Sequence, residues 1–488
     1  MAAEIRRVAV KITTMVRRKL KANPYFKISL SGELGSFEHS VLAFRVMILH
    51  FLSIGNKFTP PSCQRNWYLT LESFQKLVHG LSFKKYPPKS SLAHRNFPWH
   101  NGLMTGKERV LAALAHEEAD RVPLVFGGTN ATGIKMGAYR AVKRLLGVQK
   151  EDRYIYDWPE LGTAQVDEEV LQRLGSDVRA VLDRYPDEVY RRVKARPPHT
   201  PFVDDWGTGQ SEIEPGHWYP GIHPMAEATT LKEIEEYPWP NMDDPSRVAQ
   251  VKAETQALAA SGQYAILGCP WLLFPFERAH AMQGLDTFLA NLLVEPEFAQ
   301  ALLWKIEELS EKLMGHFLDE AGDRLDMIKI GDDLGTQESL MISPETYRSM
   351  LKPVHAKLIS FIKSKTRAKI FFHSDGDVYD LIPDFIEIGI DILNPIQSGA
   401  GRMSDLARLK KTYGKNLVFC GALDTQHILP HGTPEQVRQE VKRVCSTLGK
   451  GGGFMLAAVH TIMDEVPAEN ILAMADALKE FGAYPLGD

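Results

Sequence analysis

Phe371-Phe372-His373-Ser374-Asp375-Gly376 is an apolar run that stops abruptly at a His-x-Asp pair. A short apolar run bounded by polar residues is typical of a strand that is buried on both faces. Seven more such runs follow residue 104: Val122–Phe126, Asp177–Leu182, Tyr264–Leu267, Met327–Ile330, Ile390–Leu393, Leu417–Phe419 and Phe454–Val459. Each of them also ends at or near polar residues.

Stretches with the apolar period of a helix, such as Val294–Ala321 and Thr433–Leu448, separate most of these runs. Eight alternations of strand and helix predict the α/β class and a (β/α)8 TIM barrel. In that fold the residues just past the strand ends line one common mouth. We therefore expect the polar endings to converge although they are far apart in sequence.

The chain divides into a predicted extension, residues 1–103, and a predicted barrel, residues 104–488. Thr105 and Glu108 have the spacing of a capping box at the start of a first helix. The link from about Tyr185 to Gln263 is far longer than a barrel helix requires and is rich in Pro, Trp and acidic residues. We predict that it forms an insertion on the rim of the barrel.

Residues 1–103 hold 16 Lys and Arg but only four acidic residues, whereas the whole chain has a net charge of −4. This basic segment could bind nucleic acid, direct the protein to an organelle, or be an extension without a catalytic part. We favour the last interpretation, because no nucleic-acid motif is present. Charges interrupt every apolar stretch before it reaches membrane-spanning length, and the four cysteines fit a reducing compartment. We expect a cytoplasmic protein, with organelle targeting left open.

His373 and Asp375 are two residues apart at a strand end, so their side chains point to the same side. His460, at the end of the last apolar run, can reach the same mouth. Two imidazoles and one carboxylate can hold Zn²⁺ with one coordination position open, or another divalent metal. Alternatively, His373 caps the barrel by hydrogen bonding and His460 donates a hydrogen bond to a substrate. The spacing alone leaves both interpretations open.

Asp332 and Asp333 place two adjacent carboxylates at the fourth strand end. Because adjacent residues face opposite ways, we expect one to enter the mouth as a catalytic group and the other to be held in a turn. Capping of a following helix is the structural alternative. Four polar residues near other strand ends are candidates for substrate binding: Gln337, Asn394, Gln397 and Asp424.

For one glutamate and two cysteines the sequence gives weaker evidence of a functional role. Glu277 is a possible additional metal ligand. Cys269 and Cys420 have no basic partner nearby in the sequence, so we expect them to be small buried residues rather than nucleophiles.

Several motifs together resemble the uroporphyrinogen decarboxylase superfamily. They are Met104–Leu114, Asp120-Arg121-Val122-Pro123, Gly331–Gln337, His373–Gly376, Asp391–Pro395 and Pro467–Ile471. The resemblance spans about residues 104–486 and excludes the basic segment. The chain is more similar to the methyltransferase branch than to the porphyrin decarboxylases, because their N-terminal Arg-Gln-Ala-Gly-Arg motif is missing.

The resemblance implies a TIM barrel that moves methyl groups between a corrinoid protein and a small acceptor such as a thiol. Members of this branch hold zinc with His-x-Cys and a later Cys, and the metal turns the thiol into a thiolate. His373 matches the His of that motif, Asp375 replaces the first Cys, and His460 stands near the position of the second. These harder ligands leave room for a different metal, a different acceptor or no metal.

Three functional hypotheses follow from these observations. The first is a metal-assisted methyltransferase with a corrinoid protein as partner. The second is a metal-independent decarboxylase of a substrate other than uroporphyrinogen. The third is a non-catalytic barrel that binds a tetrapyrrole or a corrinoid protein.

Overall fold

The computed structural model describes residues 104–129, 131–155, 162–197, 200–214, 217–271 and 274–487. The basic segment 1–103 lies outside the described residues, so its boundary and its role remain predictions. Among the residues described, no helix is both long enough and apolar enough to cross a membrane.

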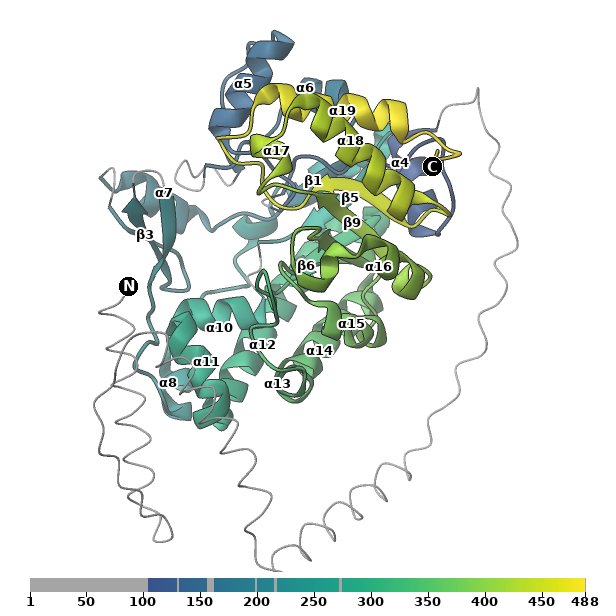
Figure 1. Cartoon of the computed structure of the whole chain (residues 1–488). Helices are drawn as coiled ribbons and strands as arrows, with labels where there is room; N and C mark the ends of the chain where they lie inside the picture. The colour runs from purple at the N-terminus through teal and green to yellow at the C-terminus, as the bar shows by residue number, and fades with distance from the viewer. Residues whose placement is uncertain are drawn as a thin grey trace, which may run out of the picture. The chain divides into compact units, whose positions relative to one another are not determined.

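Seven parallel strands form one sheet in which each strand neighbours the next along the chain (Figure 1). They are β1 Val178–Leu182, β5 Ala265–Cys269, β6 Met327–Gly331, β7 Lys369–His373, β8 Ile392–Ile396, β9 Val418–Leu423 and β10 Phe454–Ala458. Each of these strands overlaps one of the predicted apolar runs, although the observed bounds of β7, β8 and β9 differ from the predicted ones by one to four residues. The predicted barrel of alternating strands and helices is therefore confirmed.

The remaining predicted strand, Val122–Phe126, precedes β1 in the sequence and does not form a regular strand. It pairs with β10 through a single parallel bridge between Leu124 and Leu456. On its other side, the Leu124 carbonyl accepts a hydrogen bond of 2.9 Å from the N–H of Asp177, just before β1. The Asp177 carboxylate, rather than a backbone carbonyl, accepts the N–H of Leu124 at 2.8 Å. Because side chains replace part of the hydrogen-bond ladder, this segment joins β10 to β1 without forming a regular strand.

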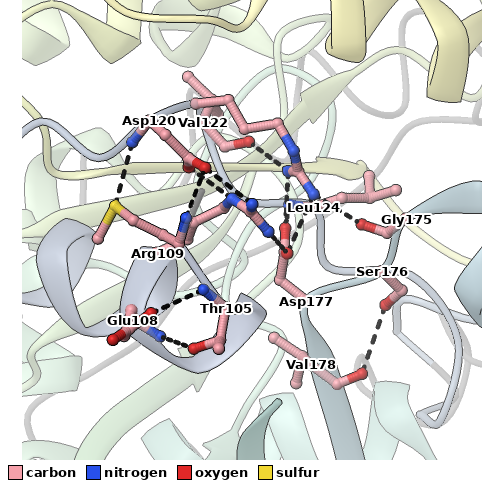
Figure 2. A network of polar contacts seen from close by, with 12 residues as sticks. Thr105, Glu108, Arg109, Asp120, Val122, Leu124, Gly175, Ser176, Asp177 and Val178 are labelled. Carbon is pink, nitrogen blue, oxygen red and sulfur yellow. Dashed lines mark hydrogen bonds and ion pairs between the residues drawn. The ribbon is translucent and has the colours of Figure 1, made fainter. Parts of the chain in front are cut away.

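Asp177 is the centre of an ionic network that joins this segment to α4 Gly106–Leu114 (Figure 2). Its carboxylate, only 3% exposed, accepts hydrogen bonds from Arg109 Nη1 at 3.0 Å and from Arg121 Nη1 at 2.7 Å. Arg109 also contacts Asp120 at 2.6 Å. The network therefore fastens the helix that contains Arg109, the bridging segment and the start of β1 to one another.

Sixteen α-helices are present in the described part of the chain. They are α4 Gly106–Leu114, α5 Met136–Leu146, α6 Glu168–Leu174, α7 Asp187–Ala195, α8 Leu231–Glu236, α9 Val251–Ser261, α10 Pro275–Gln283, α11 Leu285–Val294, α12 Pro296–Ala321, α13 Pro344–Thr346, α14 Lys352–Lys365, α15 Ile382–Ile388, α16 Leu406–Tyr413, α17 Ile428–His431, α18 Pro434–Val444 and α19 Ala468–Phe481. The predicted capping box begins α4: the Thr105 hydroxyl accepts the Glu108 N–H, and the Glu108 carboxylate accepts the Thr105 N–H.

The strands separate two apolar cores because successive side chains point to opposite faces. The larger core lies between the sheet and the helices and contains, for example, Ile328 and Phe372. The smaller core contains the alternate residues of the strands, such as Met327 and Phe371, together with residues of α4. It fills the inside of the barrel, as in other barrels of this type.

The predicted rim insertion between β1 and β5 folds as α7, a small antiparallel sheet, α8 and α9. The sheet contains β2 Phe202–Val203, β3 Gly209–Glu214 and β4 His217–Ile222. The Asp204 carboxylate, beside β2, accepts a hydrogen bond of 2.9 Å from Arg278 Nη1 in α10. Arg278 is 1% exposed, so this buried ion pair ties the insertion to α10.

We expect residues 104–488 to fold without the basic segment. The capping box at Thr105 starts α4, and the charge of the chain changes sign near this point. A fragment of residues 104–488 should be monodisperse and should unfold cooperatively on heating, as judged by circular dichroism. Aggregation of the fragment, or a non-cooperative transition where the full chain unfolds cooperatively, would show that the segment belongs to the core.

Candidate metal and substrate site

Three predicted ligands lie together at the carboxyl-terminal ends of the strands. His373 ends β7, Asp375 lies in the turn that follows, and His460 follows β10. His373 Nε2 is 3.9 Å and His460 Nε2 is 3.8 Å from Asp375 Oδ2. One ligand atom from each residue lies within 4.8 Å of the others. The structure thus brings these residues together as expected, although 85 positions separate Asp375 from His460.

His373 is held in an orientation that suits a metal ligand. Its Nδ1 lies 2.7 Å from Asn394 Oδ1 on the neighbouring strand β8. Because an amide oxygen only accepts hydrogen bonds, Nδ1 carries the proton and Nε2 keeps its lone pair. Such a partner on the far ring nitrogen is the usual support of a metal-bound histidine.

Asp375 is placed by the turn after β6. Its N–H donates a hydrogen bond of 2.9 Å to Asp333 Oδ1. The next residue, Gly376, has a φ of +87°, and a Cβ there would lie 2.4 Å from the carbonyl carbon of Gly335. Only glycine permits this close approach of the two turns. One buried oxygen of Asp375, Oδ1, has no hydrogen-bond partner among the described residues.

The electrostatics favour the protonation states that bind metals. Burial lowers the pKa of His373, and partial burial lowers the pKa of His460. Burial also raises the pKa of Asp375 to about 6. At neutral pH the imidazoles are therefore neutral and the Asp375 carboxylate is mostly ionised, as metal ligation requires.

Asp332 and Asp333 divide their roles as adjacent residues in a strand end do. Asp332 is fully buried and accepts hydrogen bonds from the N–H groups of Phe276 and Glu277 and from His355 Nε2, at 3.1, 2.8 and 2.7 Å. It therefore holds the N-terminus of α10. Asp333 Oδ1 instead lies 4.0 Å from His373 Nε2. We expect the catalytic role predicted for this pair of acids to belong to Asp333.

Glu277, in the first turn of α10, belongs to the same group of acids. Burial raises its pKa well above the ordinary range, and the charges of Asp333, Asp332 and Asp375 raise it further. Glu277 therefore holds its proton to a higher pH than an ordinary glutamate does. The protonated carboxyl can donate a hydrogen bond, and it would have to lose its proton to bind a metal.

The other predicted substrate-binding residues shape the surrounding turns. Gln397 Oε1 accepts the N–H of Gly376 at 2.7 Å, which fixes the turn that contains Asp375. Asp424 Oδ1 accepts the N–H of Gln426 at 2.7 Å, which fixes the turn after β9. Gln337 is exposed. Of the four, Asn394 alone contacts a residue of the ligand cluster, and substrate binding by the set remains a prediction.

A profile of the uroporphyrinogen decarboxylase (URO-D) family matches residues 218–481, more than half of the chain. The chain belongs to the uroporphyrinogen decarboxylase family. The uroporphyrinogen decarboxylase of Psychromonas ingrahamii is 24% identical over 219 residues, which cover 44% of this chain and 57% of that protein. The methylated-thiol–coenzyme M methyltransferase of Methanosarcina mazei is 24% identical over 268 residues, which cover 54% of this chain and 67% of that protein.

Among solved structures, a methyltransferase from Methanosarcina mazei superposes with a TM-score of 0.53 at 18% sequence identity. The superposition covers 78% of this chain and all of that chain. This likeness shows that the described barrel has the fold of that methyltransferase. The sequence matches show an enzyme family with both decarboxylases and a methyltransferase among the relatives of this chain.

Within this URO-D family barrel, the residues present suit a divalent metal with nitrogen and oxygen ligands. Two neutral imidazoles and one carboxylate make such a set. Their separations of 3.8 and 3.9 Å exceed by a little the roughly 3.3 Å between ligand atoms of a tetrahedral zinc site. The unpartnered Asp375 Oδ1 leaves a buried oxygen for a further contact. The chemistry of these donor atoms therefore fits a divalent metal ion.

Two buried cysteines of this family member, Cys269 and Cys420, hold their protons at neutral pH. Burial raises the pKa of Cys269 to about 11 and that of Cys420 to about 12. Both thiols therefore stay protonated, as expected for small buried residues.

The sequence did not single out Lys329, which belongs to β6. A lysine inside the otherwise apolar run Met327–Ile330 was the available signal. The strand period places it on the inner face of the barrel with Met327, but only the register of the sheet relates it to His373.

Proposed function

We propose that this chain is a methyltransferase that moves a methyl group between a corrinoid carried by a partner protein and a small acceptor, with the help of Zn²⁺ or another divalent metal. The convergence of His373, Asp375 and His460 at one end of the barrel carries the proposal. The methyltransferase among the relatives supports the reaction type. The corrinoid partner and the small acceptor follow from the resemblance to the methyltransferase branch.

The ligand residues would hold the metal in the forms that the site already favours. His373 would bind through Nε2, because Asn394 occupies Nδ1. Asp375 would supply the negative charge, and His460 the third ligand. A bound divalent metal lowers the pKa of a coordinated thiol or water and so supplies a nucleophile at neutral pH.

The neighbouring acids would handle the proton that the acceptor loses. Asp333 lies beside His373 and Asp375 and is 31% exposed, so it can accept a proton and pass it to solvent. Burial raises the pKa of Glu277, and in its protonated form Glu277 would donate a hydrogen bond without adding charge. Asp332 would keep α10, and with it Glu277, in position.

Metal analysis combined with a transfer assay tests the proposal. Protein purified without chelator and offered Zn²⁺, Co²⁺, Mn²⁺ and Fe²⁺ in turn should retain at least one of them at about one ion per chain. The loaded protein should demethylate methylcobalamin in the presence of a thiol, which is followed by the absorbance of the corrinoid. If no metal is retained and the alanine variants of the ligands keep full activity on an identified substrate, the proposal is wrong.

A metal-independent decarboxylase is the second candidate. The family match and the Psychromonas ingrahamii relative favour it. In that reaction Asp333 would stabilise a protonated intermediate of a substrate other than uroporphyrinogen. Release of CO₂ from a pyrrole carboxylate, undiminished by a chelator and lost in Asp333→Asn, would support this candidate against the first.

A further inference from the structure

A buried histidine of α14 lies behind the candidate site, in the apolar layer between the sheet and the helices. His355 is 3% exposed, and its ring packs against Phe372 of that layer with 5.7 Å between the ring centroids. His355 Nε2 lies 2.7 Å from Oδ2 of the fully buried Asp332. Its other ring nitrogen, Nδ1, lies 3.3 Å from the hydroxyl of Tyr347, which is also fully buried. Tyr347, His355 and Asp332 therefore form a continuous polar chain, called here the Tyr-His-Asp chain.

The directions of the hydrogen bonds in the Tyr-His-Asp chain follow from Asp332. Its carboxylate also accepts the N–H groups of Phe276 and Glu277, the second and third residues of α10, at 3.1 and 2.8 Å. An ionised carboxylate only accepts hydrogen bonds, so His355 Nε2 carries a proton and donates it. Nδ1 of the neutral imidazole then accepts the Tyr347 O–H. A buried carboxylate is costly without such donors, and here three donors share it.

Asp332 connects the Tyr-His-Asp chain to three parts of the site. Its backbone N–H donates a hydrogen bond of 3.0 Å to the carbonyl oxygen of His373. Its carboxylate caps α10, because the residue at the start of that helix, Phe274, has no side-chain cap of its own. Arg278 follows the two capped residues and forms the buried ion pair with Asp204 of the rim insertion. The orientation of Asp332 therefore bears on a candidate metal ligand and on the attachment of the insertion.

We propose that His355 is a positioning residue for the candidate metal site, because it keeps the Asp332 carboxylate turned toward α10. This inference rests on the proposed metal-assisted function. His355 contacts neither the ligand cluster nor the mouth and acts only through Asp332. Without the proton of His355 Nε2, the one donor left to Asp332 Oδ2 is the N–H of Phe276, at 3.1 Å. The first turn of α10 would then open more often, and His373 would lose part of its support.

The competing interpretation is that the Tyr-His-Asp chain contributes only to the overall stability of the barrel. In that case any substitution that destabilises α14 would have the same consequences for α10 and for the metal. Local hydrogen exchange separates the two interpretations, because it reports the opening of individual elements as well as global unfolding.

The first measurement needs neither metal nor substrate. Hydrogen exchange of the chelator-treated full chain, followed by mass spectrometry of its peptides, reports the opening of the first turn of α10. His355→Leu should raise the exchange rate of the Phe276 and Glu277 amides at least about tenfold relative to the wild-type chain. His355→Gln, whose side-chain amide can still donate to Asp332, should restore most of the protection. Tyr347→Phe should raise the rate less than His355→Leu does.

The second measurement is the affinity for Zn²⁺ in competition with a chromophoric chelator. His355→Leu should bind the metal about tenfold more weakly, which is the lower end of the 10–100-fold loss expected when a residue that orients a ligand is removed. His355→Gln should bind it nearly as tightly as the wild-type chain. This rescue by a side chain that shares only the hydrogen-bond donor of histidine would not occur if packing alone mattered.

Ile362→Val is the matched control, because Ile362 lies two turns further along the same face of α14, is fully buried and has no polar side-chain atom. It should lower the unfolding midpoint but leave the exchange of the α10 amides and the metal affinity unchanged. Should His355→Leu not fold, Tyr347→Phe, which loses only an O–H, carries the same comparison with this control.

Three results would overturn the inference. They are unchanged exchange of the Phe276 and Glu277 amides in His355→Leu, an equal increase in Ile362→Val, and a metal affinity that survives His355→Leu in a chain that binds metal. Failure of the proposed function would look different. The wild-type chain would then bind no metal, while the α10 amides would still respond to His355→Leu and recover in His355→Gln.

Discussion

Replacing His373 by alanine should weaken metal binding by this protein at least about 100-fold, because loss of a partner that only orients a ligand already costs 10–100-fold in metal affinity. His373 supplies one of only three donors in the cluster, and Asn394 fixes its ring for that purpose. His460→Ala should have a similar effect. Competition of Zn²⁺ or Co²⁺ between the protein and a chromophoric chelator measures both affinities.

Exposed His316, which pairs with Asp243 at 2.8 Å on the surface, offers the matched control. His316→Ala should bind metal as the wild-type chain does, and circular dichroism should show that all variants are folded. Asp375→Cys should keep the metal but shift the preference toward softer ions. Unchanged affinity in both His373→Ala and His460→Ala would place the metal elsewhere or remove it from the reaction.

Affinity for the metal should also depend on pH. The pKa of Asp375 is raised to about 6, so a proton occupies this carboxyl below that pH and must leave before a metal binds. Binding should therefore be strong at pH 7 to 8 and weaken as the pH falls through about 6. Asp375→Asn removes the titrating group, and its weaker binding should lose this part of the pH dependence.

Replacing Asp177 by alanine should lower the free energy of unfolding by about 3–5 kcal/mol, the usual result of removing one partner from a buried ionic network. Arg109 and Arg121 would each lose a carboxylate partner, and the N–H of Leu124 would lose its acceptor. The bridge that joins β10 to β1 depends on these contacts (Figure 2). Urea unfolding followed by tryptophan fluorescence measures the loss.

Asp476 provides the comparison for this second experiment. It forms an exposed pair with Lys479 in α19, and exposed pairs contribute little. Asp476→Ala should therefore unfold at nearly the wild-type urea concentration, and Asp177→Asn, which keeps one acceptor oxygen, should lie between the two. If Asp177→Ala resembles Asp476→Ala, the network does not hold the barrel closed.

Much of this fold could be predicted from the sequence because buried parallel strands are short apolar runs. The seven strands of the barrel sheet overlap such runs. His373, Asp375 and His460 lie together at the carboxyl-terminal ends of these strands. Periodicity did not show that Val122–Phe126 would form a single bridge. The hydrogen bonds that replace its ladder come from the side chain of Asp177, whose position depends on the finished barrel.

The site was predictable as a group of residues but not as a set of roles. Adjacent Asp332 and Asp333 had to face opposite ways, but the sequence could not say which of them enters the mouth. That choice depends on α10. The first N–H groups of α10 donate hydrogen bonds to Asp332, although they lie more than 50 positions earlier in the sequence. The position of Lys329 could not be predicted for a related reason. Only the register of β6 against β7 shows that Lys329 lies two residues below the level of His373 in the barrel.

The bridge between Leu124 and Leu456 has a consequence for how the protein is made. Almost the whole barrel separates these two residues in the sequence, so the first strand segment of the barrel to leave the ribosome must remain unpaired on this side until the last strand has been synthesised. Ser176 and Asp177 emerge much sooner and can cover one edge of that segment with their side chains. The other edge stays open until β10 arrives. We therefore expect nascent chains that stop before residue 454 to need a chaperone, and closure of the barrel to follow translation rather than accompany it.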